Sequence, residues 1–261
     1  MKTQSLLSRI VFLLTLALAA NRILAAADAN FSGTWKLNLA KSQLSGPVYT
    51  FEKKASGAWH YNGGGFDADF DLTGKEYIMP SGVGVTGKEL SPTSWELTFR
   101  NGGKLISKSR VTLSGDSLTW VSDMTGPDGK SVQQTNTDKR VSGGPGFAGK
   151  WKSGDLKGSS TTLQITMEGA NGITIQTPEA QQVVKGSFDG KDVPVMQAGQ
   201  ATKITNAFTK NGPNTFKVTT KLNGKLFGED VFTLSADGKT LTDDSTATAT
   251  SEKTKSVFDK Q

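Results

Sequence analysis

The acidic side chains offer the first candidates for chemistry. Asp67, Asp69 and Asp71 alternate along one segment, so on a strand they would share a face, with successive members about 7 Å apart. Three carboxylates on one face could hold a cation, but a calcium loop needs glycine at its sixth position and a bidentate glutamate at its twelfth. Leu72 and Ile78 occupy those positions. We therefore expect a solvated strand face and no metal ion.

The residues needed for nucleophilic or zinc chemistry are also missing. The chain holds one histidine, His60, and no cysteine, which cannot supply the ligand set of a zinc site. No G-x-S-x-G elbow marks a nucleophilic serine. Asp243 and Asp244 are adjacent and would point to opposite faces of a strand, which makes a poor acid–base pair. We therefore expect no enzyme activity and no cofactor.

One glycine-rich segment matches a nucleotide-binding fingerprint. Residues 82–87, GVGVTG, fit the pattern G-x-G-x-x-G, which binds pyrophosphate where a strand turns into a helix. The next residues, KELSP at 88–92, cannot begin a crossover helix of useful length. The segment therefore predicts a glycine-kinked strand.

Aromatic residues carry the strongest functional signal. They recur at alternating positions in the later segments of both halves of the chain, so on strands they would face the core. In a barrel, the core and the lining of any cavity are the same face, and a barrel of about eight strands can hold one small ligand. The candidate ligand-binding residues are Trp95, Phe99, Trp120, Phe208, Phe216 and Phe232.

The elements that would position these aromatics are β-strands. Apolar and polar residues alternate over 95–100 and 216–222, which is typical of half-buried strands. Asn-Gly or Asp-Gly pairs at 101–102, 128–129, 189–190, 223–224 and 237–238 favour tight hairpin turns. No segment after the N-terminal apolar run keeps a helical period over three turns. The sequence therefore predicts an all-β fold of antiparallel up-and-down meanders that close into barrels.

An internal repeat indicates two such barrels in tandem. The hexamer F-x-G-x-W-K occurs at 31–36 and again at 147–152, 116 residues later. Further matches follow, and the offset grows only at turn-like segments, where insertions cost little. A glycine-rich linker, SGGPG at 142–146, separates the copies. We therefore predict one β-barrel domain at 28–141 and a second at 147–261.

The hexamer at the start of each repeat resembles the first strand of the calycins, the lipocalins and fatty-acid-binding proteins. The resemblance implies that Trp35 and Trp151 plug one end of each barrel, and that an arginine near the last strand packs over the tryptophan. Arg140 would cover Trp35, whereas the second repeat offers only lysines for this role. The lid helices and the Arg-x-Tyr carboxylate anchor of the fatty-acid-binding branch have no counterpart here.

The first 27 residues predict a signal peptide rather than part of the fold. Lys2 and Arg9 form a basic start, an apolar run follows over 10–20, and small residues at 25–27 fit a cleavage site. We expect a secreted or periplasmic protein; the absence of cysteine excludes a lipid-modified N-terminal cysteine and disulfides.

The charge distribution and the strand pattern limit the classes of partner that we expect. Without residues 1–27 the chain holds 27 basic and 24 acidic residues, and its lysines are scattered, so no basic footprint for nucleic acid exists. Lysine and threonine on the outward strand faces argue against a membrane span in the mature chain.

Two functions remain open. The first is a binding protein that holds a small, largely apolar ligand in one or both barrels. The alternative is a pair of cavity-free β-domains that acts as a protein- or glycan-interaction module, with exposed Trp59, Tyr61 and Tyr77 as its platform. The first requires space inside a barrel, and the second requires filled barrels and exposed aromatics.

Overall fold

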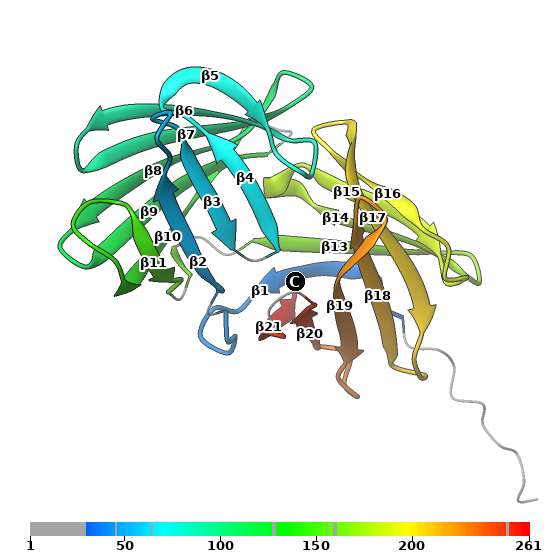
Figure 1. The fold of residues 1–261 in the computed structure, drawn as a ribbon. Coiled ribbons are helices and arrows are strands. Elements are labelled where there is room, and N and C mark those ends of the chain that lie inside the picture. The colour runs from blue at the N-terminus through cyan, green and yellow to red at the C-terminus, as the bar shows by residue number, and fades with distance from the viewer. Residues whose placement is uncertain are drawn as a thin grey trace, which may run out of the picture.

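The computed structural model describes residues 30–44, 46–63, 65–126, 129–154, 156–158, 161–248 and 251–261. The predicted signal peptide at 1–27 lies outside the described residues. Within them the chain is all-β, with one short 3-10 turn, η2 (Pro178–Ala180). The predicted pair of antiparallel barrels is confirmed, one closed and one left open at a seam (Figure 1). None of the described residues form a helix that is long and apolar enough to cross a bilayer.

The closed barrel is a ring of strands in which each pairs with two neighbours, because β1 pairs with both β13 and β21. In ring order its strands are β1 (Gly33–Leu37), β13 (Thr162–Glu168), β14 (Gly172–Thr177), β15 (Gln182–Ser187), β16 (Val193–Gln197), β17 (Gln200–Lys210), β18 (Thr215–Leu222), β19 (Lys225–Leu234), β20 (Thr240–Ala247) and β21 (Lys253–Lys260).

The open barrel is a curved sheet whose two end strands, β4 and β5, are not paired with each other. From one end to the other its strands are β4 (Phe66–Phe70), β3 (Trp59–Gly63), β2 (Val48–Lys53), β11 (Gly149–Lys152), β10 (Ser131–Ser142), β9 (Ser117–Thr125), β8 (Lys104–Ser114), β7 (Ser94–Asn101), β6 (Gly84–Ser91) and β5 (Thr73–Ile78), and β12 (Lys157–Gly158) pairs with β10.

Each barrel takes its F-x-G-x-W-K strand from the other half of the chain. β1, from the first repeat, lies between β13 and β21. In Figure 1, β1 is the blue strand beside the red strand β21. β11, from the second repeat, lies between β2 and β10. Because the two strands carry the same hexamer, each fits the slot that the other would fill, as in domain swapping. The barrels therefore cross the boundary predicted at 142–146.

The exchange also reassigns the cation that covers the tryptophan of each hexamer. Trp35 and Trp151 are fully buried, and the indole Nε1 of each donates a 3.0 Å hydrogen bond to the carbonyl four residues earlier. The prediction that Arg140 covers Trp35 is wrong: its guanidinium lies 4.1 Å from the ring centre of Trp151. Lys260 lies over Trp35 instead, at 5.1 Å. In each case the cation is the cross-strand partner of the tryptophan. Because the two hexamer strands are exchanged, Trp35 meets Lys260 of the second repeat and Trp151 meets Arg140 of the first.

Candidate functional site: a cavity in the open barrel

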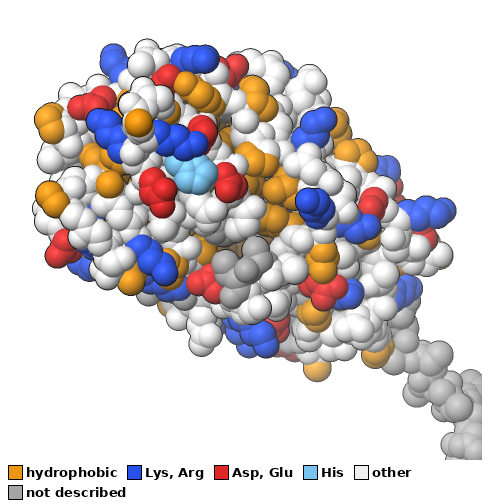
Figure 2. Space-filling model, viewed as in Figure 1, with side chains coloured by type: hydrophobic (Ala, Val, Ile, Leu, Met, Phe, Trp, Pro, Cys, Tyr) orange, Lys and Arg blue, Asp and Glu red, His pale blue; other side chains and the backbone are white. Residues whose placement is uncertain are grey.

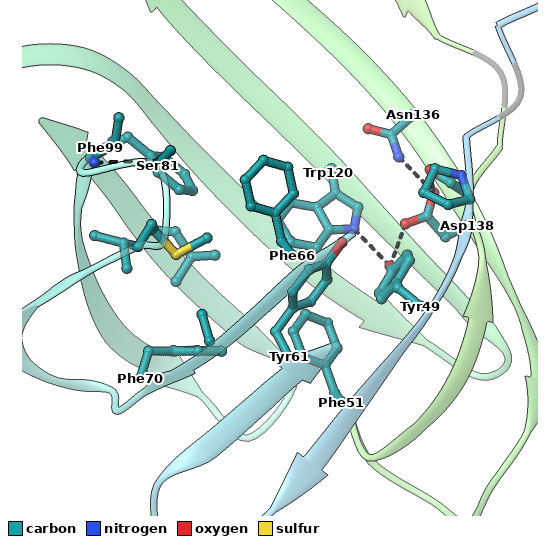
Figure 3. A pocket seen from close by; sticks show the side chains of 17 residues that line it. Tyr49, Phe51, Tyr61, Phe66, Phe70, Ser81, Phe99, Trp120, Asn136 and Asp138 are labelled. Atoms are coloured by element: carbon teal, nitrogen blue, oxygen red, sulfur yellow. Dashed lines mark hydrogen bonds between the residues drawn. The ribbon is translucent and has the colours of Figure 1, made fainter. Parts of the chain in front are cut away.

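The interior of the open barrel holds a cavity of about 420 Å³ (Figure 3). Strands β2 to β4 form one wall, β6, β7, β9 and β10 form the other, and the loop between β5 and β6 closes one side. The lining residues are Pro47, Tyr49, Phe51, Tyr61, Phe66, Ala68, Phe70, Met79, Ser81, Val83, Val85, Leu97, Phe99, Trp120, Asn136, Asp138 and Ser153.

The aromatic wall follows from strand register. Phe51 on β2 pairs with Tyr61 on β3, which pairs with Ala68 on β4, so these side chains share the inner face. Tyr49 pairs with Gly63. A Cβ atom at Gly63 would collide with the Cβ and Cα atoms of Tyr49, so this close pairing of β2 and β3 requires glycine. Period-two alternation thus delivers one apolar, aromatic face to the cavity.

A polar corner centres on Asp138 of β10, whose side chain is buried. Its Oδ2 accepts a 2.5 Å hydrogen bond from the Tyr49 hydroxyl, and the Tyr49 oxygen accepts one from the Trp120 indole at 3.3 Å. Its Oδ1 accepts from the Asn136 amide at 2.6 Å, as well as from the side chain of Ser153 and the backbone N–H of residue 154. A buried carboxylate with this many donors is well satisfied. The network therefore fixes the Tyr49 and Trp120 side chains in the cavity wall.

Burial and charge keep the two cavity tyrosines protonated. Burial raises the pKa of Tyr49, and its hydrogen bond to the Asp138 carboxylate raises it further. Burial raises the pKa of Tyr61 to about 12, with the negative charge of Asp138 as the second cause. Both phenols are therefore neutral hydrogen-bond donors at physiological pH.

Only two of the six predicted ligand-binding aromatics line this cavity. Phe99 on β7 and Trp120 on β9 do so. Trp95 lies in the same barrel but is buried, with its ring stacked 3.7 Å from that of Phe147. Trp95 therefore packs against the second hexamer rather than facing a ligand.

The other three predicted residues fill the closed barrel. Phe216 and Phe232 stack with ring centres 4.8 Å apart, and Phe31 packs edge-on against Phe216. Phe208 and Phe216 are fully buried. Farther along the interior, the closed barrel holds carboxyl groups at Asp230 and Asp243, and burial raises the pKa of both. The sequence pattern thus found aromatic core positions in both barrels without distinguishing packed core from cavity lining.

Sequence reasoning missed the β2–β4 wall and the buried carboxylate. Tyr49 and Phe51 alternate along β2, a signal that the strand pattern already contained. Trp59 and Tyr61 were expected on an exposed platform, but Trp59 is buried and Tyr61 lines the cavity. The role of Asp138 was not predictable, because nothing in the sequence around it reveals which strands surround it.

The closed barrel holds one rim of the cavity in place. The backbone carbonyl of Ser81, in the β5–β6 loop, accepts a hydrogen bond from the Lys203 N–H at 2.8 Å. The Asn223 side chain donates to the carbonyl of Pro80 at 3.1 Å. On the neighbouring rim, the rings of Phe66 and Phe227 lie 5.1 Å apart. The two barrels therefore share a contact along the edge of the cavity.

His60 lies on the outer face of β3 and pairs with carboxylates. Its Nδ1 lies 2.7 Å from Asp69 and its Nε2 lies 3.7 Å from Asp67, and Figure 2 shows acidic side chains on either side of the pale blue histidine. Within the described ranges, no group of three or more His, Cys, Asp and Glu side chains could hold a metal ion.

Comparison with known proteins adds no assignment: no family model, curated protein or solved structure matches the chain.

Proposed function

We propose that this protein binds a small, largely apolar molecule in the cavity of the open barrel. The observation that carries the proposal is an interior space of about 420 Å³ with an aromatic lining and one polar corner. Ligand pockets are commonly about 300–1,000 Å³, apolar, and fitted with a few fixed polar groups. Binding requires no catalytic step, and we propose none.

Desolvation would supply most of the affinity. A ligand that buries about 300 Å² of apolar surface gains about 7 kcal/mol at 25 cal/mol per Å². Lost translational and side-chain freedom offsets part of this gain. We therefore expect dissociation constants in the micromolar range for simple aromatic ligands, and tighter binding where a ligand also satisfies a polar group.

Titration with prodan, a neutral fluorescent naphthalene ketone, tests the proposal. Ala68 lies on the cavity lining, so Ala68→Phe should fill part of the space and weaken prodan binding at least tenfold. Ala55→Trp, in the exposed turn between β2 and β3, is the control and should leave binding unchanged. The proposal fails if wild-type protein shows no saturable binding at micromolar concentrations, or if both variants bind equally.

We further propose that the protein acts outside the cytoplasm and belongs with the lipocalin-like calycins. The basic start and apolar run of residues 1–27 support export, and the paired tryptophan plugs support the family. N-terminal sequencing of protein recovered from the periplasm or medium should show cleavage within 20–27. Recovery of a chain that still begins at Met1 would contradict export.

A further inference from the structure

The cavity contains one phenol that is engaged and one that is not. The Tyr49 hydroxyl donates to Asp138 and accepts from Trp120, so it is occupied on both sides. The Tyr61 hydroxyl, which points into the cavity in Figure 3, has no hydrogen-bond partner among the described residues. A phenol in an apolar enclosure without a partner forgoes a hydrogen bond that a ligand can supply. Tyr61 is therefore the place where an apolar ligand would be oriented.

The protonation state of Tyr61 decides which kind of ligand group can form a hydrogen bond with it. Burial and the charge of Asp138 raise its pKa to about 12, so at neutral pH it carries its proton. A protonated phenol donates a hydrogen bond to an oxygen acceptor on the ligand. The ligand end that meets Tyr61 should therefore carry an acceptor.

The charge pattern of the lining excludes an anionic acceptor. Among the described residues of the lining, Asp138 is the charged one, and none is a lysine, arginine or histidine. A ligand carboxylate would lose its hydration in this enclosure without gaining a cation, and it would face the Asp138 charge. A ligand cation has no better partner, because donors of the protein already occupy both Asp138 oxygens. The lining thus disfavours both signs of ligand charge.

We propose that the ligand is a neutral, apolar molecule with a carbonyl-type oxygen, and that this oxygen accepts a hydrogen bond from Tyr61. The inference rests on the proposed function of the cavity. It separates this protein from carriers of fatty acids, because a carboxylate headgroup has no anchor here. Asp138 acts as a positioning residue, since it holds Tyr49 and Trp120 and leaves Tyr61 as the free donor.

Three naphthalene probes of similar size test the proposal by competition against prodan: a methyl ketone, the corresponding ethyl hydrocarbon and the carboxylate. For wild-type protein, we expect the ketone to bind about tenfold more tightly than the hydrocarbon, the range of one net hydrogen bond. The carboxylate should bind at least tenfold more weakly than the ketone at pH 7. Equal affinity of ketone and carboxylate would overturn the proposal.

Tyr61→Phe is the decisive variant. It should weaken ketone binding about tenfold and leave hydrocarbon binding unchanged, because only the ketone loses a hydrogen bond. Tyr77→Phe is the matched control: that hydroxyl bonds to Asp71 and does not line the cavity, so all affinities should persist.

The outcomes separate the two proposals. Saturable binding of all probes with no loss in Tyr61→Phe overturns the carbonyl inference and leaves the cavity function standing. Absence of saturable binding by every probe overturns both. Thermal melting of each variant checks that the fold is kept.

Discussion

The closed and open barrels use equivalent strand positions differently. Each barrel has a row of register partners on its inner face, and the two rows can be aligned through the hexamers. The glycine of each hexamer pairs with the first residue of one row: Gly149 with Phe51, and Gly33 with Ile165. Large rings stand on the wall of the open barrel, and branched aliphatic side chains stand in the closed one. The matching rows of register partners are Phe51, Tyr61 and Ala68 in the open barrel, and Ile165, Ile175 and Val184 in the closed barrel.

Closure explains why the larger side chains coincide with the larger space. β1 joins β13 to β21, so the closed barrel has a fixed circumference that Phe208 and Phe216 fill. In the open barrel β4 and β5 remain unpaired with each other, so no strand pairing fixes its circumference. Side chains then line the interior without filling it. One repeat can thus yield one packed interior and one interior that holds a cavity.

The buried acidic residues lie at different positions in the two barrels. Leu118 and Leu241 are counterparts in the repeat, within SLT at 117–119 and TLT at 240–242. Leu118 pairs with Asp138 in the open barrel, whereas Leu241 pairs with Phe258 in the closed barrel. In the open barrel the acid sits in a network of donors beside the cavity. In the closed barrel the acids lie on β19 and β20, where one oxygen of Asp243 has no hydrogen-bond partner among the described residues. The two barrels thus bury carboxyl groups at different positions. Hydrogen-bond donors surround Asp138, whereas burial raises the pKa of Asp230 and of Asp243.

Removing the tryptophan of each hexamer should have the largest effect and tests the strand exchange. Trp35→Ala and Trp151→Ala each delete a fully buried ring, at an expected cost of about 3–5 kcal/mol. Trp35→Ala should speed hydrogen exchange in β13 and β21, although these strands belong to the second half of the sequence. Trp151→Ala should do so in β2 and β10. Hydrogen-exchange mass spectrometry would refute the exchange if Trp35→Ala loosened β2 and β10 instead.

That exchange marks the limit of what the sequence could predict. Alternation and Asn-Gly turns correctly predicted strands and hairpins; Asn223, for example, has φ 51° in the turn between β18 and β19. These signals are local. The slot that each hexamer strand occupies is decided by long-range pairing, and two strands with the same motif satisfy either slot. The cavity escaped prediction for the same reason, since closure of a barrel depends on pairing between distant strands.

A pH titration sharpens the electrostatic side of the comparison. Burial, followed by the neighbouring charges of Asp230 and Asp244, raises the pKa of Asp243 to about 8. The folded state thus holds a proton that the unfolded chain releases near pH 4. Stability from this group is complete below pH 4 and is lost as the pH rises toward 8. We expect a loss of about 2–4 kcal/mol across this window.

Asp243→Asn should flatten that pH dependence, because its side chain stays neutral. Asp244→Asn, on the exposed side of β20, is the control and should keep most of the slope. Urea denaturation at intervals from pH 4 to 8.5 measures the effect. A wild-type stability that rises across this window would contradict the assignment.

Enlarging equivalent side chains tests which barrel is filled. Ala68 and Val184 occupy matching positions in the two rows. Val184→Phe should destabilise the closed barrel by about 1–3 kcal/mol, because its core has no space for a ring. Ala68→Phe projects into the cavity and should change stability by less than about 1 kcal/mol. Equal losses in urea denaturation would mean that the two interiors do not differ in packing.

The smallest expected effect concerns the cations over the two hexamer tryptophans. Arg140 is held on several sides: besides stacking on Trp151, its guanidinium donates to the carbonyls of Gly146 and Ala148 and pairs with Asp116. Lys260 makes a longer contact with Trp35, at 5.1 Å. A cation–π contact contributes about 0.5–1 kcal/mol where the charged group still reaches solvent, and each hydrogen bond adds about as much again.

Arg140→Ala should therefore cost about 1–2 kcal/mol, and Lys260→Ala about 0.5 kcal/mol. Arg140→Lys separates charge from geometry, since lysine keeps the cation but loses the planar fork that reaches two carbonyls while stacking on the ring. Its stability in urea should fall between those of wild type and Arg140→Ala. If Arg140→Lys matched wild type in stability, the positive charge alone would account for the effect of Arg140 on Trp151. A cation would then stabilise the exchanged strand in the same way in both barrels.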